Sequence, residues 1–408
     1  MRKLLFITTA NLTTNPRLLK EVKAASPYNQ CEVICFKLCN WSDTFEEGHI
    51  ASLSNIKVHY ISAGRKPFFL WLFSTLTERV AQRIYPVLQS NLFLTSIASN
   101  KRTWLLLNAV KHIKDKPDLI IAHNLGALYP AYRLAKELNT KFTFDIEDYH
   151  PGERINTDQE NEKKRREYLL RKLLPDAAYL SYASPLIGLE TLNLLKESYT
   201  KPHSYIANSF SQSEFIEPDT AKTDKLRLVW FSQNIAAGRG LEILIESLDG
   251  LDNQIELHLY GNLDKTYFEK NLNQQYIFIH TPLPQRELHL ELAKYDIGLA
   301  LEINEADFNR NICLTNKIYA YALAGLYILA TNTQGQEWFL NEYPWSGELV
   351  GQDKESIRIK IQELICNTEE IRRNSKDRFR LAKMLSWEHE HNKLNLLWQE
   401  VVVSNENN

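Results

Sequence analysis

The sequence predicts an α/β protein with two doubly wound, Rossmann-like domains, each a parallel sheet covered by helices on both faces. The chain has 408 residues, too many for one ordinary core at very roughly 150 residues per domain. Hydrophobic residues make up 44% of the chain and charged residues 24%, as in folded globular proteins. Short, continuously apolar runs alternate with helical patterns, which is typical of parallel strands buried on both faces.

The first half begins with an apolar run at residues 3–8, which predicts a strand. Pro16 follows a polar stretch and opens a helical pattern at residues 17–25, because proline is favoured in the first helical turn. The other elements expected in this half are a helix at residues 129–138 and strands at residues 31–36, 56–61, 118–122 and 141–144.

The second half repeats the alternation. It predicts helices at residues 240–248, 286–294 and 316–324, and strands at residues 226–231, 255–260, 276–280, 297–301 and 327–331. A polar stretch at residues 206–223 indicates the join, so we expect domains at residues 1–207 and 208–385. Ligands of open parallel sheets bind beyond the carboxyl ends of the strands, and two such sheets are expected to face a central cleft.

Charge and composition exclude several classes of protein. The chain has 48 Lys and Arg against 50 Asp and Glu, so we expect no nucleic acid partner. Its cysteines show no C-x-x-C spacing, which argues against a structural zinc site or a disulfide framework. The amino-terminal apolar run is too short for a signal peptide, and no stretch approaches the ~20 apolar residues of a membrane-spanning helix. These features predict a cytoplasmic protein.

Residues 315–325 form the most informative segment. Thr315 is a candidate N-cap, and the helix that follows would aim its first backbone amides and the side chain of Lys317 at a phosphate. Gly325 would end this helix before the next strand. The alternative is a capped core helix with an incidental lysine, and these residues alone leave both interpretations open.

A second signal is the loop at residues 232–240. Gly238 and Gly240 allow close approach of the backbone to a ligand, and the guanidinium of Arg239 suits two phosphate oxygens. The loop lacks the third glycine of a dinucleotide-binding fingerprint. The alternative for Arg239 is an ordinary surface arginine.

Together these segments resemble the GT-B glycosyltransferases, in particular family 4 (group 1), retaining enzymes that move a sugar from a nucleotide-sugar donor. The resemblance spans most of the chain. It is carried by Asn-Pro-Arg17-Leu-Leu, Asn208, Gly325 and residues 119–124, 144–150, 238–242, 257–261 and 315–317. It also implies a last helix, at residues 386–408, that returns to the N-terminal domain.

The resemblance implies a donor site in the second half. The diphosphate would be bound by Gly238, Arg239, Thr315, Asn316 and Lys317, with Gly261 and Asn262 bordering the donor and Leu283 near the base. The family commonly has a ribose-binding glutamate where this chain has Ala320. Either Glu302 or Glu305 would take that role, or donor binding is altered. Since no Asp-x-Asp motif lies in a convincing loop, we expect a reaction that needs neither a metal nor a cofactor.

Glu147, His150 and His123 are the candidate catalytic residues. Carboxylates in a partly closed cleft acquire shifted pKa values, and imidazole titrates near neutrality. The alternatives are a polar strand end that caps the next helix or binds Arg154, and a His123 that bonds a backbone carbonyl. The resemblance implies that the leaving phosphate assists the incoming hydroxyl, so no protein nucleophile is expected.

The sequence therefore predicts a hexosyltransferase-like enzyme of polysaccharide or glycolipid biosynthesis, with a nucleotide-sugar donor and a carbohydrate or lipid-linked acceptor. One alternative is a catalytically silent GT-B partner that binds nucleotide sugars, and another is a nucleotide-sugar epimerase. Residues 64–73, with Arg79 and Arg83, suit peripheral contact with the inner face of a membrane. An apolar helix packed on the sheet edge explains the same pattern.

Overall fold

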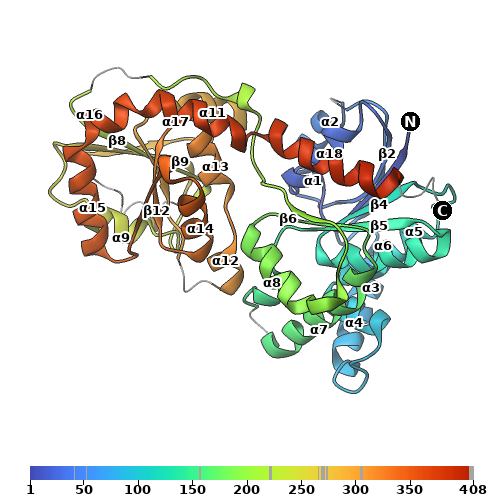
Figure 1. The fold of residues 1–408 in the computed structure, drawn as a ribbon. Coiled ribbons are helices and arrows are strands. Elements are labelled where there is room, and N and C mark those ends of the chain that lie inside the picture. The colour runs from blue at the N-terminus through green and yellow to red at the C-terminus, as the bar shows by residue number, and fades with distance from the viewer. Residues whose placement is uncertain are drawn as a thin grey trace. The chain divides into compact units, whose positions relative to one another are not determined.

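The computed structural model describes residues 1–40, 42–51, 53–155, 158–219, 223–264, 266–267, 272, 274–303 and 307–403. The chain forms two compact units (Figure 1). Unit 1 comprises Met1–Ile206 and His391–Asn408, and unit 2 comprises Ala207–Glu390. Each unit contains one parallel sheet with flanking helices, which confirms the predicted fold class. The cleft between the two halves stays a prediction.

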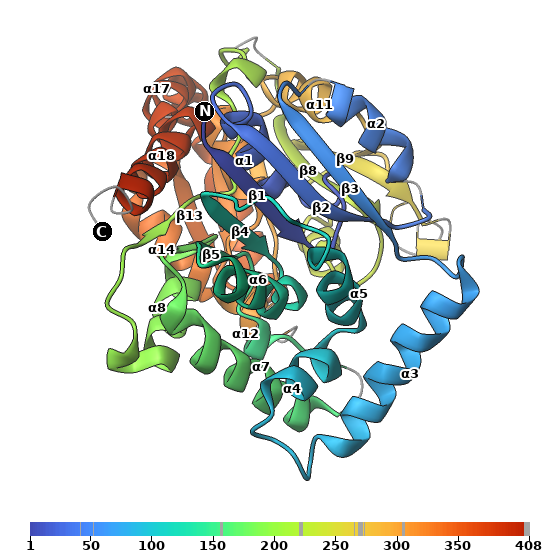
Figure 2. The same cartoon turned by 90° about the vertical axis from the view of Figure 1, so that its right-hand side faces the viewer.

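Unit 1 is built on a sheet with the strand order β3-β2-β1-β4-β5-β6-β7. Its strands are β1 (Lys3–Thr8), β2 (Gln30–Lys37), β3 (Ile56–Ser62), β4 (Leu119–His123), β5 (Lys141–Ile146), β6 (Leu180–Tyr182) and β7 (His203–Tyr205). Its helices include α1 (Pro16–Ala25), α2 (Asp43–Ala51), α3 (Phe68–Ile84), α4 (Leu92–Ser99), α5 (Lys101–Val110), α6 (Leu125–Leu138), α7 (Gln159–Leu173) and α8 (Pro185–Leu195). Figure 2 looks onto this unit and shows α6 in front of the sheet.

Unit 2 is built on a sheet with the strand order β10-β9-β8-β11-β12-β13. Its strands are β8 (Leu226–Ile235), β9 (Ile255–Leu263), β10 (Ile277–His280), β11 (Ile297–Ala300), β12 (Tyr327–Thr331) and β13 (Gly347–Val350). Its helices include α9 (Leu241–Ser247), α11 (Gln285–Leu292), α12 (Phe308–Ile312), α13 (Asn316–Leu323), α14 (Gln334–Glu342), α15 (Lys354–Cys366), α16 (Thr368–Arg373) and α17 (Ser375–Leu381). The last helix, α18 (Trp387–Val403), runs from residues of unit 2 into residues of unit 1.

The predicted start of α1 is confirmed. Asn15 caps the helix by accepting a hydrogen bond from the amide of Leu18 at 2.9 Å, and Pro16 occupies the first turn. Proline is tolerated there because its missing N–H would have no partner inside the helix.

The predicted start of α6, at residue 129, is wrong by four residues, since the helix begins at Leu125. Pro130 lies inside this helix and cannot donate to the carbonyl of Gly126. The hydroxyl of Thr103, on α5, donates to that carbonyl instead at 2.9 Å. The neighbouring helix therefore supplies the bond that the proline removes.

Both sheets reverse their strand order next to the central strand, between β1 and β4 in unit 1 and between β8 and β11 in unit 2. Ligands of open parallel sheets bind at such reversals, beyond the carboxyl ends of the strands. These two edges are therefore where functional side chains are expected. None of the helices in the described part of the chain is both long and apolar enough to cross a membrane.

Candidate functional site

The loop that carries Arg239 leaves β8 at the reversal point of unit 2. Gly240 has a φ of +78°, and a Cβ there would lie 3.2 Å from the Cβ of Leu301, which follows β11. The amide of Gly238 donates to Glu242 at 2.9 Å, which fastens the loop to α9. The guanidinium of Arg239 is exposed and has no ion-pair partner among the residues that the structure describes. The loop thus presents a cation next to the end of β11.

Lys317 lies near that strand end, in the first turn of α13. Its ammonium group is 3.4 Å from Oε1 of Glu302 and 5.4 Å from the ring centroid of Trp230. The side chains of Lys317 and Glu302 are only 12% and 14% exposed. Because Glu302 directly follows Leu301, against which the Arg239 loop packs, the structure brings Arg239 and Lys317 to the same edge of the sheet.

The beginning of α13 leaves its first turn open to a ligand. Thr315 occupies the N-cap position, but its side chain accepts no hydrogen bond from the helix. A first turn without such a cap keeps amide donors available for an anion. Asn316, the first helical residue, is half-buried beside it.

The position of Ala320 is completely buried in α13. An alanine there offers no acceptor for a ribose. Of the two carboxylates expected to replace it, Glu302 lies next to Lys317, whereas Glu305 falls outside the described residues. Glu302 is held by its backbone, since its amide donates to the hydroxyl of Thr331 and its carbonyl accepts from that hydroxyl, both at 2.8 Å.

Gly261 and Asn262 lie beside the end of β8. Gly261 has a φ of +156°, and a Cβ there would come within 2.6 Å of the carbonyl oxygen of Ser232. The side chain of Asn262 donates to the carbonyl of Gln233 at 2.9 Å. Leu283 follows β10, which is separated from β8 by β9.

Two residues at this edge were missed from the sequence. Thr331 ends β12, and the side-chain nitrogen of Gln336 donates to its hydroxyl at 3.2 Å. The side-chain oxygen of Gln336 is buried and has no partner within the described residues. The pattern Thr333-x-x-Gln336 resembles a capping box and could have drawn attention to them: Thr333 accepts from the amide of Gln336 at 3.3 Å.

In unit 1, His123 ends β4 inside a buried network of charges. One ring nitrogen lies 3.3 Å from Glu21 on α1, and the other lies 3.3 Å from Glu147 and 3.5 Å from Asp145. Arg17 donates to both carboxylate oxygens of Asp145, at 2.5 and 2.7 Å. His123 has no exposed surface. It therefore connects α1 with two strands of unit 1, β4 and β5.

Charges within this network determine its protonation. Burial lowers the pKa of His123, but Glu21, Glu147 and Asp145 outweigh that effect and raise it to about 10. Burial also raises the pKa of Asp145, whereas Arg17 and His123 hold it below its ordinary value. His123 is thus an imidazolium at neutral pH, which does not suit a general base.

Ligand atoms of Glu21, His123 and Asp145 all lie within 4.8 Å of one another, as in a metal site. The carboxylate of Asp145 is already bonded to the guanidinium of Arg17 and to the hydroxyl of Ser181. A metal ion would have to displace this arginine and the proton of His123. The cluster is better described as a buried structural network of ion pairs.

Asn124, directly after β4, has a strained backbone with φ +66° and ψ +145°. Side-chain-bearing residues seldom adopt this conformation, and it costs of order 1–3 kcal/mol. Its amide group accepts from the hydroxyl of Thr8 at 2.7 Å and donates to Glu147 at 3.1 Å. The side chain of Glu147 is 20% exposed. Strain and convergent polar groups make this edge the candidate binding site of unit 1.

His150 does not join that group. Its ring lies 3.2 Å from Glu153, and Arg166 bonds both the same glutamate and the carbonyl of His150. Burial lowers the pKa of His150, but Glu153 raises it above its ordinary value. Of the three predicted catalytic residues, the structure brings His123 and Glu147 together and places His150 in a separate ion-pair cluster.

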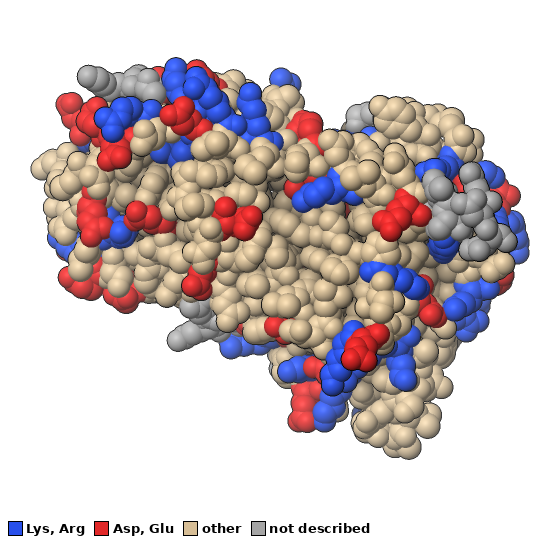
Figure 3. Space-filling model, viewed as in Figure 1, with Lys and Arg blue, Asp and Glu red and all other residues tan. Residues whose placement is uncertain are grey.

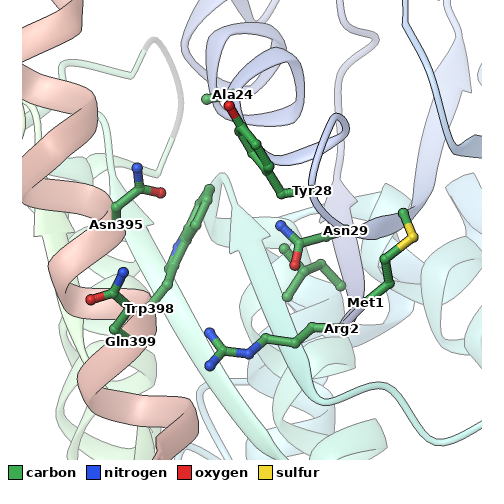
Figure 4. Close-up of a pocket in the computed structure, with 9 residues that line it drawn as sticks. Met1, Arg2, Ala24, Tyr28, Asn29, Asn395, Trp398 and Gln399 are labelled. Carbon is green, nitrogen blue, oxygen red and sulfur yellow. The ribbon is translucent and has the colours of Figure 1, made fainter.

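A pocket of about 390 Å³ lies at the opposite edge of unit 1, where β1 begins (Figure 4). Arg2 and Asn29 face the side chains of Asn395, Trp398 and Gln399 from α18 across it. It lies at the amino ends of the strands, away from Asn124 and Glu147. The indole of Trp398 donates to the hydroxyl of Tyr179 at 2.8 Å, so this pocket borders the packing of α18 on unit 1.

Two Rossmann-like units, each with one reversal of strand order, have the architecture of the GT-B glycosyltransferases, and the chain has this fold. It is similar to the crystal structure of HepE from Anabaena in complex with UDP, with a TM-score of 0.67 and 15% identity, over 98% of this chain and 100% of that one. No protein-family model matches the chain, and no curated protein matches it.

Other solved structures share the fold, with comparably low sequence identities. A glycosyltransferase from Rickettsia africae has a TM-score of 0.67 and 13% identity, over 98% of both chains. Sucrose-phosphate synthase from Thermosynechococcus elongatus has a TM-score of 0.68 and 12% identity, over 99% of this chain and 100% of that one. A putative UDP-N-acetylglucosamine 2-epimerase from Listeria monocytogenes is also similar, with a TM-score of 0.54 and 12% identity, over 98% and 96%.

Proposed function

We propose that the protein is a glycosyltransferase that moves a sugar from a nucleoside-diphosphate sugar to a hydroxyl of an acceptor. Unit 2 binds the donor and unit 1 binds the acceptor. The observation that carries the proposal is the convergence of Arg239 and Lys317 on the reversal point of the unit 2 sheet, next to an uncapped helix start. The GT-B fold and the UDP complex of HepE support the same donor class.

The chemistry follows from charge. The bond between the anomeric carbon and the diphosphate breaks, and the acceptor oxygen forms the new bond to that carbon. The departing diphosphate gains negative charge, which Arg239, Lys317 and the amides of α13 stabilise. The acceptor proton passes to the leaving phosphate on the same face, so the anomeric configuration is retained. These fixed cations stabilise the negative charge that a metal ion would otherwise stabilise.

In this proposal, Glu302 binds the ribose hydroxyls in place of a carboxylate at Ala320. Glu147 and Asn124 face the acceptor, and His123 positions Glu147 through the contact between its ring nitrogen and the carboxylate. The acceptor is a carbohydrate or a lipid-linked sugar, because a carboxylate and an amide at one edge suit sugar hydroxyls.

The test is turnover of UDP-, GDP-, TDP- and ADP-sugars. We expect one donor to stabilise the protein in a thermal-shift assay and to be slowly hydrolysed without acceptor, with release of the nucleoside diphosphate and a sugar of retained configuration. Tight binding of a donor without any turnover would favour a catalytically silent partner, which the buried Ala320 motivates. Conversion of the sugar without release of nucleotide would favour an epimerase, as the similarity to the Listeria protein suggests.

A further inference from the structure

Helix α3 turns its large apolar side chains toward solvent and its small ones inward. Besides Phe68, which is exposed by 54%, five large apolar residues are exposed by 71%, 56%, 46%, 52% and 39%, namely Phe69, Phe73, Leu76, Val80 and Ile84. We call these five residues the outer face of α3. Their spacing of three or four residues places them on one side of the helix. Soluble proteins seldom leave such a continuous apolar stripe uncovered.

The inner side of α3 packs against other helices of unit 1. Ser74 and Ala81 are buried there, and Ala81 packs against Ile97 and Ala98 of α4. The side chain of Gln82 donates to the carbonyl of Ala98 at 3.1 Å. Figure 2 shows α4 and α5 on the inner side of α3. The contacts that hold the helix in place are therefore made by its inner side and not by its outer face.

The apolar surface continues past the end of α3. Val87 and Leu88 are exposed by 82% and 49%, and Phe93 on α4 is exposed by 48%. In Figure 3 the lower end of unit 1, where Figure 1 places the connection from α3 to α4, is almost entirely free of charged atoms.

The charged groups around the outer face are mostly positive. Residues 64–94 contain Arg65, Lys66, Arg79 and Arg83 against a single acid, Glu78, and all four cations are exposed. Glu78 faces inward and accepts a hydrogen bond from the amide of Lys101 at 3.0 Å. Arg79 and Arg83 are four residues apart, next to the apolar stripe.

We propose that the outer face of α3 docks on an anionic lipid bilayer. Its aromatic and aliphatic side chains enter the headgroup boundary, and Arg65, Lys66, Arg79 and Arg83 bind lipid phosphates. Charge complementarity favours this occupant over a second copy of the chain. Two α3 helices packed through this face would bring arginines together, while their only acid is engaged on the inner side.

The experiment is co-sedimentation of the full chain with vesicles of phosphatidylcholine, with and without phosphatidylglycerol. We expect binding to the anionic vesicles and little binding to the neutral ones. Phe69→Ser/Phe73→Ser should lower binding roughly a hundredfold, since burial of each phenylalanine is worth about 1.5 kcal/mol or more. Arg79→Gln/Arg83→Gln should lower binding to anionic vesicles about thirtyfold.

The matched control is Leu189→Ser/Leu396→Ser, which removes two apolar side chains exposed by 52% and 65% elsewhere in unit 1. It should bind vesicles like the wild type. Because all these residues are exposed, the variants should keep the melting temperature of the wild type. The proposal is overturned if the wild type ignores anionic vesicles or if the phenylalanine variant binds them fully. It is also overturned if the wild type is a dimer that the phenylalanine variant converts to a monomer.

Discussion

The residue that most directly tests the donor site is Glu302, because it faces Lys317 from 3.4 Å. If it binds the ribose, Glu302→Gln removes a charged acceptor from the nucleoside and at the same time releases Lys317 for phosphate. We expect tighter binding of inorganic diphosphate and an affinity ratio of UDP to diphosphate that falls roughly tenfold. Titration calorimetry with both compounds measures this ratio.

The matched control for that variant is Glu246→Gln, an exposed glutamate on α9. It should leave both affinities unchanged. A ratio that is the same in Glu302→Gln and in the wild type would show that Glu302 does not contact the nucleoside.

The protonation of His123 should make the stability of the folded protein depend on pH. Its pKa is raised from 6.5 to about 10 in the folded protein, so the folded state keeps a proton that the unfolded chain loses. The stabilisation from this proton is complete below a pH of about 6.5 and disappears as the pH rises to about 10. We expect the free energy of unfolding to fall across this range by on the order of 5 kcal/mol, measured by urea denaturation of the full chain.

Glu147→Gln should weaken this dependence, because Glu147 is one of the groups that raise the pKa of His123. Glu47→Gln, an exposed position on α2, is the control and should follow the wild type. Parallel curves for Glu147→Gln and the wild type would contradict the assignment.

At the scale of elements, alanine substitutions at two glycines distinguish the cost of backbone strain from the cost of steric overlap. Gly238 and Gly325 have φ values of +76° and +74°. A Cβ at Gly238 meets nothing within 4 Å, whereas one at Gly325 would lie 2.7 Å from the carbonyl oxygen of Ser375. We expect Gly238→Ala to cost about 1 kcal/mol and Gly325→Ala about 3 kcal/mol or more.

Thermal unfolding of unit 2 in the two glycine variants measures this difference. Equal losses in both variants would mean that the end of α13 is not packed against α17 as the structure has it.

The elements also show what the sequence can predict. Strands such as β1 and β12 were found because they are apolar along their whole length, which follows from burial on both faces. β6 and β7 have only three residues each, at least two of them polar or aromatic-polar, and β13 combines a glycine with a glutamate, so none of them gives an apolar run. The orientation of α3 could not be decided, since an apolar stripe has the same spacing whether it faces a core or solvent.

For the candidate site, the sequence indicated Arg239 and Lys317 from loop and helix-start chemistry. The pairing of Lys317 with Glu302 depends on the return of the chain from β11 to α13, and the role of Thr331 depends on β12 lying beside β11. Contacts between neighbouring strands of this kind arise from topology, which local patterns do not contain. The burial of His123 between Glu21 and Glu147 likewise cannot be read from its neighbours in sequence.

At the scale of the whole molecule, the proposed activity requires that a nucleoside diphosphate binds at the carboxyl edge of the unit 2 sheet. Titration calorimetry of the full chain with UDP, the nucleotide in the HepE complex, tests this most directly. Arg373→Ala and Lys376→Ala serve as controls, since both are exposed near Arg372, which bonds Asp296 at the amino end of β11. We expect Arg239→Ala and Lys317→Ala each to weaken UDP binding roughly tenfold or more, while the controls bind like the wild type. Equal affinity in all five proteins would contradict this expectation.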